Sequence, residues 1–210
     1  MSRERLNVYV DGFNLYHGLH DQARCRWLWL DLVALAERLR PRSDVQLVHY
    51  FTAPVLGQPQ AQSRQQEYQD ALVGHNGSRV CIVQGRYQSK SKRCRSCGST
   101  WTEREEKETD VNIAVTLVSE AAQHAMDAAL IVSADSDLAP AVRAARNLKP
   151  DLFIAAAFPP KRFSAELKSL MPASFHIGRA KILDSMLPES VHDGVRELRR
   201  PAKWSPHTPA

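Results

Sequence analysis

The sequence lacks the long apolar runs that membrane-spanning proteins carry. No stretch approaches the roughly 20 apolar residues that a helix needs to cross a bilayer. The chain begins MSRER, with neither an apolar signal region nor a cleavage site after it. We therefore expect a cytoplasmic protein.

Cysteine is also scarce, with 4 residues among 210. In a reducing compartment, cysteines serve as thiols or metal ligands more often than as disulfides. We therefore expect no disulfide framework and a core that holds itself together by packing.

The motifs of two other α/β protein classes are missing as well. No glycine-rich turn follows the first predicted strand, which argues against dinucleotide binding. Phosphatases with an aspartyl nucleophile often carry a second acid two residues after the first, but that position after Asp11 is Phe13. The sequence therefore argues against both classes.

What the chain does contain is enough apolar material for one sizeable core. Hydrophobic residues make up 43% of the sequence, and the length suits one domain with a short appendage. We place this domain at residues 1–185 and a polar, proline-rich tail at 186–210. Lys and Arg outnumber Asp and Glu by 28 to 23, and the isoelectric point is about 9.2, a mild basic bias that is compatible with a nucleic-acid partner.

Strand-like and helix-like segments alternate along the chain. Segments with apolar residues at helical spacing, the clearest at 109–122, separate short apolar runs that predict strands. Continuous apolar strands that alternate with helices are typical of a doubly wound, mainly parallel α/β sheet. In such sheets ligands bind at the carboxyl ends of the strands. The predicted strands lie at 6–10, 45–51, 80–83, 128–132 and 152–158.

Four aspartates lie where predicted strands end or where a helix begins. Asp11 follows the first strand, and Asp110 opens the helix before the fourth strand. Asp135 and Asp137 follow the fourth strand. Carboxylates that share a crevice repel one another unless a cation neutralises them, and Mg²⁺ or Mn²⁺ suits an all-oxygen site. We expect a shared metal site of the kind that handles phosphate chemistry.

Each aspartate also has a simpler interpretation on its own. Asp110, Asp135 or Asp137 could favour a helix N-terminus, and Asp11 could be a turn residue. Capping needs only one oxygen per helix, so four acids from three segments favour the shared site. Asn14, one helical turn after Asp11, could bind a phosphate or orient an acid.

Three blocks of the sequence resemble the signature blocks of the NYN domain family, which belongs to the PIN-like nuclease superfamily. The blocks are 8–14 (VYVDGFN), 106–114 (EKETDVNIA) and 130–138 (LIVSADSDL). They come in the family's order, and the resemblance covers roughly residues 5–180. It implies a three-layer α/β/α fold, an acid cluster that binds Mg²⁺ or Mn²⁺, and hydrolysis of RNA phosphodiester bonds.

The resemblance also assigns catalytic residues. The acids that match the family are Asp11, Asp110, Asp135 and Asp137, and Asn14 matches the amide of the first block. No histidine in these blocks is placed as a general base, so a metal-bound water would be the nucleophile. The leading hypothesis is a metal-dependent ribonuclease, and the alternative is a non-catalytic RNA-binding module that has kept the fold.

A charged segment at 86–107 precedes the helix that Asp110 opens, and we expect a long loop there. Basic side chains contact phosphates, and aromatic rings stack on bases. The segment is therefore either an RNA guide that overhangs the acidic crevice or a solvated loop with incidental charge. The candidate RNA contacts are Arg86, Lys90, Lys92, Arg93, Arg95, Trp101 and Lys107.

Within that segment Cys94 and Cys97 are half of a zinc knuckle, with CxxC spacing and Gly98 after it. A structural zinc site needs four ligands, and no second CxxC follows. Cys25, Cys81, histidines or a second subunit could complete the site, and the last case would make a homodimer. The rival interpretation is a pair of reduced thiols on an exposed loop.

Overall fold

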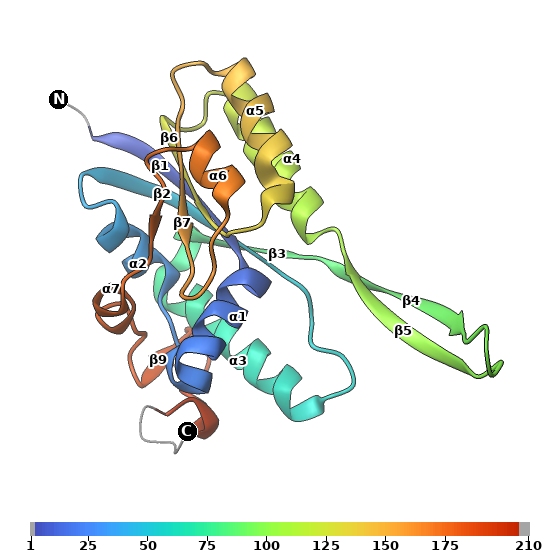
Figure 1. The fold of residues 1–210 in the computed structure, drawn as a ribbon. Helices are drawn as coiled ribbons and strands as arrows, with labels where there is room; N and C mark the ends of the chain where they lie inside the picture. The colour runs from blue at the N-terminus through green and yellow to red at the C-terminus, as the bar shows by residue number, and fades with distance from the viewer. Residues whose placement is uncertain (1–2, 206–210) are drawn as a thin grey trace.

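The computed structural model describes residues 3–205, without the side chains of residues 88–90 and 102–107 (Figure 1). Helices cover both faces of a central sheet, and a long hairpin extends from this body to one side. None of the helices in this part of the chain has the length and apolar character needed to cross a membrane.

Six parallel strands form the central sheet of the described chain, in the order β3-β2-β1-β6-β7-β8. Strand β1 lies inside the sheet, where Val8 is 1% exposed and Tyr9 is fully buried. Burial on both faces explains why this strand is a continuous apolar run. The bounds are Glu4–Asp11 for β1, Ser43–Thr52 for β2, Val80–Gln84 for β3, Ala128–Val132 for β6, Phe153–Phe158 for β7 and Phe175–His176 for β8.

Helices on the two faces complete a three-layer α/β/α arrangement, which confirms the predicted fold class. Successive side chains of β1 point to opposite faces, so Val8 packs in one core and Tyr9 in the other. The core of Val8 is covered by α1 (Gly12–Ala23), α2 (Leu32–Leu39), α3 (Pro59–Asn76) and α7 (Arg179–Leu183). The core of Tyr9 is covered by α4 (Thr109–Ala122), α5 (Ala139–Leu148) and α6 (Ala165–Leu170). Single 3₁₀ turns are η1 (Arg24–Trp27), η2 (Gly77–Arg79) and η3 (Ser136–Leu138).

The strand order reverses between β1 and β6, and this reversal positions the site. From β1 the chain proceeds to β2 and β3 on one side, whereas β7 and β8 follow β6 on the other. Helix α1 leaves β1 toward one face, and α5 leaves the loop after β6 toward the opposite face. Such a divergence opens a crevice at the carboxyl ends of the two strands.

Residues 86–107 form an antiparallel hairpin rather than the long loop that we expected. Strands β4 (Arg86–Arg93) and β5 (Thr100–Lys107) pair along their full length and extend away from the body (Figure 1). Most described side chains between residues 91 and 101 are exposed. No buried face therefore imposes the apolar alternation by which strands are recognised in a sequence.

The last described segment packs on the body, although its composition predicted a tail beginning at residue 186. Leu187, Leu198 and Trp204 are buried in the core that Val8 shares. These anchors are separated by polar and proline residues, so no periodic pattern marks them. The elements are β9 (Ser190–His192), β10 (Glu197–Arg199) and the 3₁₀ turn η4 (Ala202–Trp204).

Candidate active site

Asp11 is the last residue of β1 and the cap of α1. Its Oδ1 accepts a hydrogen bond from the backbone N of Asn14 at 3.0 Å, as a helix cap does. Its Oδ2 accepts a hydrogen bond from the hydroxyl of Ser133 at 2.8 Å. Capping of α1 therefore accounts for one oxygen, while the other joins Asp11 to the loop after β6.

Gly12 lets α1 begin directly against β2. A Cβ atom on Gly12 would lie 2.5 Å from the carbonyl oxygen of Phe51, which is too close for any side chain. The close approach fixes where the first turn of α1 lies, and with it the position of Asn14.

Asn14 fastens the loop after β6 to α1. Its Oδ1 accepts a hydrogen bond from the backbone N of Ala134 at 3.1 Å. In the same loop the backbone N of Asp135 donates to the Ser133 hydroxyl at 3.0 Å, and the backbone N of Asp137 donates to Asp135 Oδ1 at 2.9 Å. These contacts fit the interpretation of Asn14 as a residue that orients an acid.

Three of the four predicted aspartates line one cavity of about 200 Å³, which we call the acid cavity. Asp11 comes from β1, Asp110 from the first turn of α4, and Asp135 from the loop after β6. Asp137 is exposed and is not part of the lining. The lining consists of Asp11, Phe13, Asn14, His17, Thr109, Asp110, Asp135 and Arg162.

The charge of Asp11 is not balanced by its surroundings. Burial raises the pKa of its carboxyl above the ordinary value, and the charge of Asp135 raises it further. Hydrogen bonds from Asn14 and Ser133 lower the pKa, but the net shift is upward. The folded protein therefore disfavours the ionised form of Asp11, and a cation in the acid cavity would remove that cost.

The donor atoms of the acid cavity suit a hard divalent cation such as Mg²⁺ or Mn²⁺. Among the described residues, no three His, Cys, Asp or Glu side chains converge closely enough to hold one ion by themselves. Mg²⁺ does not require such a cage, because it usually binds through one or two carboxylates and keeps water and substrate phosphate as its other ligands. The electrostatically coupled pair of Asp11 and Asp135 therefore fits the ion.

Two residues of the acid cavity, His17 and Arg162, were not predicted from the sequence. His17 lies one turn after Asn14 on α1, so a histidine faces the acids although none lies within the three sequence blocks. The position of His17, three residues after Asn14 in a helical segment, could have identified it from the sequence. Arg162 follows the carboxyl end of β7, where the same strand-end argument applies. It pairs with Asp21 at 2.5 Å, while its buried Nε has no hydrogen-bond partner among the described residues.

The predicted RNA contacts lie in the hairpin of β4 and β5, which extends away from the body (Figure 1). Arg86, at its base, forms an ion pair with Glu108. Trp101 is 49% exposed, as a ring available for stacking would be. Lys92, Arg93 and Arg95 lie farther along the hairpin, and the side chains of Lys90 and Lys107 lie outside the described residues.

Cys94 and Cys97 lie at the tip of the hairpin. The backbone N of Cys94 donates to the carbonyl of Ser99 at 2.8 Å, which closes the turn. Hydrogen bonds, first from Ser99 and then from Cys94, lower the pKa of Cys97 to about 7. Cys25 and Cys81 belong to η1 and β3, and no third ligand joins the pair within the described part of the chain. Neither Cys25 nor Cys81 therefore completes a zinc site with Cys94 and Cys97 in the described part of the chain.

Comparison with known proteins gives a family and one named relative. The family model of the NYN domain matches residues 5–177 of this chain. The protein 6-hydroxy-3-succinoylpyridine 3-monooxygenase HspA from Pseudomonas putida (strain DSM 28022 / S16) is 28% identical, over 68% of this chain and 55% of that protein. The chain therefore spans about half the length of this relative.

A solved structure shares the fold. The crystal structure of a protein of unknown function from Vibrio parahaemolyticus RIMD 2210633 matches with a TM-score of 0.53 and 17% sequence identity. The match covers 88% of this chain and 97% of that one. At this identity the likeness concerns the fold alone.

Proposed function

The chain belongs to the NYN domain family, which has a nuclease-like fold, and on that premise we propose that it is a ribonuclease dependent on Mg²⁺ or Mn²⁺. One observation carries the proposal. Asp11, Asp110 and Asp135 come from three separate elements and line the same cavity, where the buried charge of Asp11 is unbalanced. Helix capping alone needs no such convergence.

The acids and the amide have separate roles in this proposal. Asp11 and Asp135 would hold the divalent ion, and Asp110 faces the same cavity. When bound, the ion supplies charge neutralisation on the phosphate and an activated water. Asn14 positions Asp135 through its hydrogen bond to the loop, and Asp137 supports the same carboxylate through its backbone N.

Arg162 and His17 provide a phosphate-binding cation and a proton donor, which ionised carboxylates cannot be. A guanidinium binds phosphate oxygens through several N–H groups at once, and the unpartnered Nε of Arg162 supports this role. His17 lines the same cavity and can give a proton to the leaving oxygen of the ribose. Together they place the scissile phosphate between cationic and acidic walls.

Two other functions compete with this one. An RNA-binding module that retains the fold without cutting RNA is favoured by the lack of a convergent trio of ligands among the described residues. The relative from Pseudomonas putida is named as a monooxygenase of a substituted pyridine. At 28% identity, over about half of that protein, its activity is a candidate to be assayed beside RNA cleavage.

A time course with end-labelled RNA tests the proposal. We expect cleavage with Mg²⁺ or Mn²⁺, none with EDTA, and a rate at least about 100-fold lower for Asp135→Asn. Asp151→Asn is the matched control, because Asp151 is an exposed acid just before β7, at the far end of the sheet. Calorimetric titration with Mn²⁺ should show weaker binding to Asp135→Asn only. RNA that is bound in a salt-dependent manner but stays intact would favour the binding module.

The cysteine pair has a separate proposed role. Cys94 and Cys97 form half of a tetrahedral zinc site that a second copy of the chain completes, giving a homodimer. Purified protein should then contain about half an equivalent of zinc per chain and have the mass of a dimer by light scattering. Cys97→Ser should abolish both. A zinc-free monomer under reducing conditions would contradict this role.

A further inference from the structure

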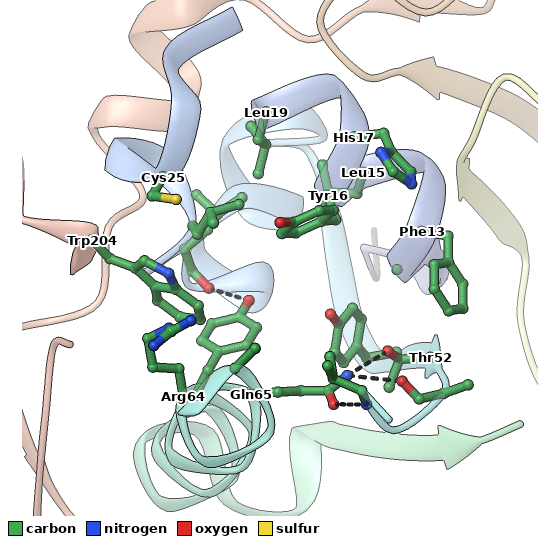
Figure 2. Close-up of a pocket in the computed structure, with 18 of the residues that line it drawn as sticks. Phe13, Leu15, Tyr16, His17, Leu19, Cys25, Thr52, Arg64, Gln65 and Trp204 are labelled. Carbon is green, nitrogen blue, oxygen red and sulfur yellow. Dashed lines mark hydrogen bonds between the residues drawn. The ribbon is translucent and has the colours of Figure 1, made fainter. Parts of the chain in front are cut away.

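A second cavity lies beside the acid cavity and has a different character (Figure 2). It encloses about 350 Å³ between α1, α3, the end of β2 and the turn η4. We call it the aromatic pocket because five Phe, Tyr or Trp side chains line it. They belong to Phe13, Tyr16, Tyr50, Tyr68 and Trp204.

The polar groups of the aromatic pocket divide into two sets. Gln65 and Tyr68 are already engaged: Gln65 accepts from the backbone N of Val55 at 2.8 Å, and Tyr68 donates to the carbonyl of Leu30 at 2.8 Å. Arg64 and Lys203, by contrast, make no ion pair with any described residue. The walls therefore offer flat apolar faces, with cations available at the lining.

The two cavities share a wall. Phe13 and His17 line both the acid cavity and the aromatic pocket. In Figure 2 both side chains extend from α1 at one side of the pocket, with Tyr16 between His17 and the interior. Since both linings include these two side chains, the two cavities adjoin along α1.

We propose that the aromatic pocket binds the base of the nucleotide next to the phosphodiester that the acid cavity holds. This inference rests on the proposed ribonuclease function. A base enters such a pocket only when it is unpaired and unstacked, so the substrate is single-stranded RNA. The volume lies within the range of about 300–1,000 Å³ that is common for small-molecule sites.

The same pocket chemistry would accept a planar nitrogen heterocycle from another source. The relative from Pseudomonas putida is named for a substituted pyridine, which has such a ring but no ribose phosphate. A nucleotide uses both cavities, whereas a free pyridine would use the rings alone. Binding measurements on both ligands therefore separate the two sources.

Calorimetric binding of nucleoside monophosphates, ribose 5-phosphate and 6-hydroxy-3-succinoylpyridine tests the pocket directly. Ala61 of α3 lines the pocket, and Ala61→Trp should fill it and weaken nucleotide binding about tenfold or more. Val73→Trp is the matched control, because Val73 is on the same helix, 41% exposed and outside the pocket. Ribose 5-phosphate should bind more weakly than nucleotides and respond to neither variant.

Tyr16→Ala provides a second variant that does not depend on how well Ala61→Trp folds. Tyr16 is 43% exposed, and its ring contacts are with His17 and His20 of the same helix, so its removal leaves the core intact. We expect it to weaken nucleotide binding about tenfold, in the same direction as Ala61→Trp. Equal nucleotide affinity in both variants and the wild type would overturn the inference.

RNA with a single abasic nucleotide links the pocket to cleavage. The bond beside the abasic position should be cut about tenfold more slowly than the same bond in intact RNA. Equal cutting of both RNAs would overturn the pocket while leaving the ribonuclease in place. If the variants weaken nucleotide binding but no RNA is cleaved, the base-binding role of the pocket stands and the ribonuclease function is overturned. Tight binding of the pyridine alone would overturn the base-binding role.

Discussion

Two acidic side chains near the middle of the molecule, Glu120 and Asp11, are shielded from solvent but held in opposite ways. Glu120 of α4 lies within hydrogen-bond distance of Asn7 Nδ2 at 2.8 Å, the Tyr9 hydroxyl at 2.5 Å and His49 Nε2 at 2.7 Å. Burial alone would raise the pKa of Glu120, but these hydrogen bonds outweigh it and leave the pKa below its ordinary value. The fold therefore favours the charge of Glu120.

Asp11 shows the reverse balance. It also receives hydrogen bonds, from Asn14 and Ser133, yet burial and the nearby charge of Asp135 outweigh them and raise its pKa. A buried acid that lowers the free energy of the folded chain has a structural explanation. A buried acid that raises it needs another explanation, and a ligand that brings positive charge supplies one.

Asp11→Asn is the strongest test of this contrast between Glu120 and Asp11. We expect RNA cleavage to fall at least about 100-fold, because a neutral amide oxygen holds a divalent ion more weakly than a charged carboxylate does. The melting temperature without metal should stay equal or rise, since Asn caps helices as well as Asp and carries no buried charge. Cleavage rates and thermal melts in EDTA measure the two effects separately.

Asp31→Asn is the control for that substitution. Asp31 caps α2, is 5% exposed and accepts hydrogen bonds from the backbone N atoms of Val33 and Ala34, but it does not line the acid cavity. Its amide variant should cut RNA at the wild-type rate. A lower melting temperature for Asp11→Asn than for the wild type would contradict the view of Asp11 as an unbalanced charge.

Glu120→Ala should have the next largest effect, on stability instead of activity. Removing the carboxylate takes the acceptor from Asn7 Nδ2 and the partner from His49 Nε2, and leaves the Tyr9 hydroxyl only the Met126 sulfur. Unsatisfied buried polar groups cost about 1–3 kcal/mol. For a chain of this size, that loss lowers the melting temperature by roughly 2–12 °C. Glu166→Ala is the comparison, because Glu166 is an exposed partner of Arg143 whose loss should cost less than about 1 kcal/mol.

The sequence alone predicted the acid cavity where strand ends define it. Asp11 and Asp135 directly follow β1 and β6, and a parallel sheet turns that position into proximity. The spacing could not tell which of two acids in one loop turns inward, so Asp137 was grouped with Asp135. His17 and Arg162 were missed because they lie outside the recognised blocks, although the same helical and strand-end arguments reach them.

The features that escaped the sequence analysis depend on partners far along the chain or on the lack of any core. Glu120 meets Asn7 and His49 across 113 and 71 residues, and no local pattern reports such a pairing. Most described side chains of the hairpin of β4 and β5 are exposed, so no buried face imposes apolar alternation on that part of it. Three side chains of the aromatic pocket, Tyr16, Tyr68 and Trp204, come from elements that lie far apart in the sequence. Taken singly, none of them differs from an ordinary core or surface residue.

The smallest predicted effect, the pH dependence of stability, tests the comparison in both directions at once. Glu120 has a lowered folded pKa, so its stabilisation is present above the ordinary value of 4.5 and is lost as the pH falls through the folded pKa. Asp11 has a raised folded pKa, so its contribution is most favourable below the ordinary value of 3.8 and is lost as the pH rises through the folded pKa.

Urea unfolding in EDTA between acidic and neutral pH measures both contributions. The stability gap, taken as wild type minus variant, should shrink toward acid for Glu120→Gln, whereas for Asp11→Asn it should shrink toward neutral pH. Each gap changes by at most about 1.4 kcal/mol per pH unit, because one proton is involved. Gaps that change in the same direction would show that the two carboxylates are held alike.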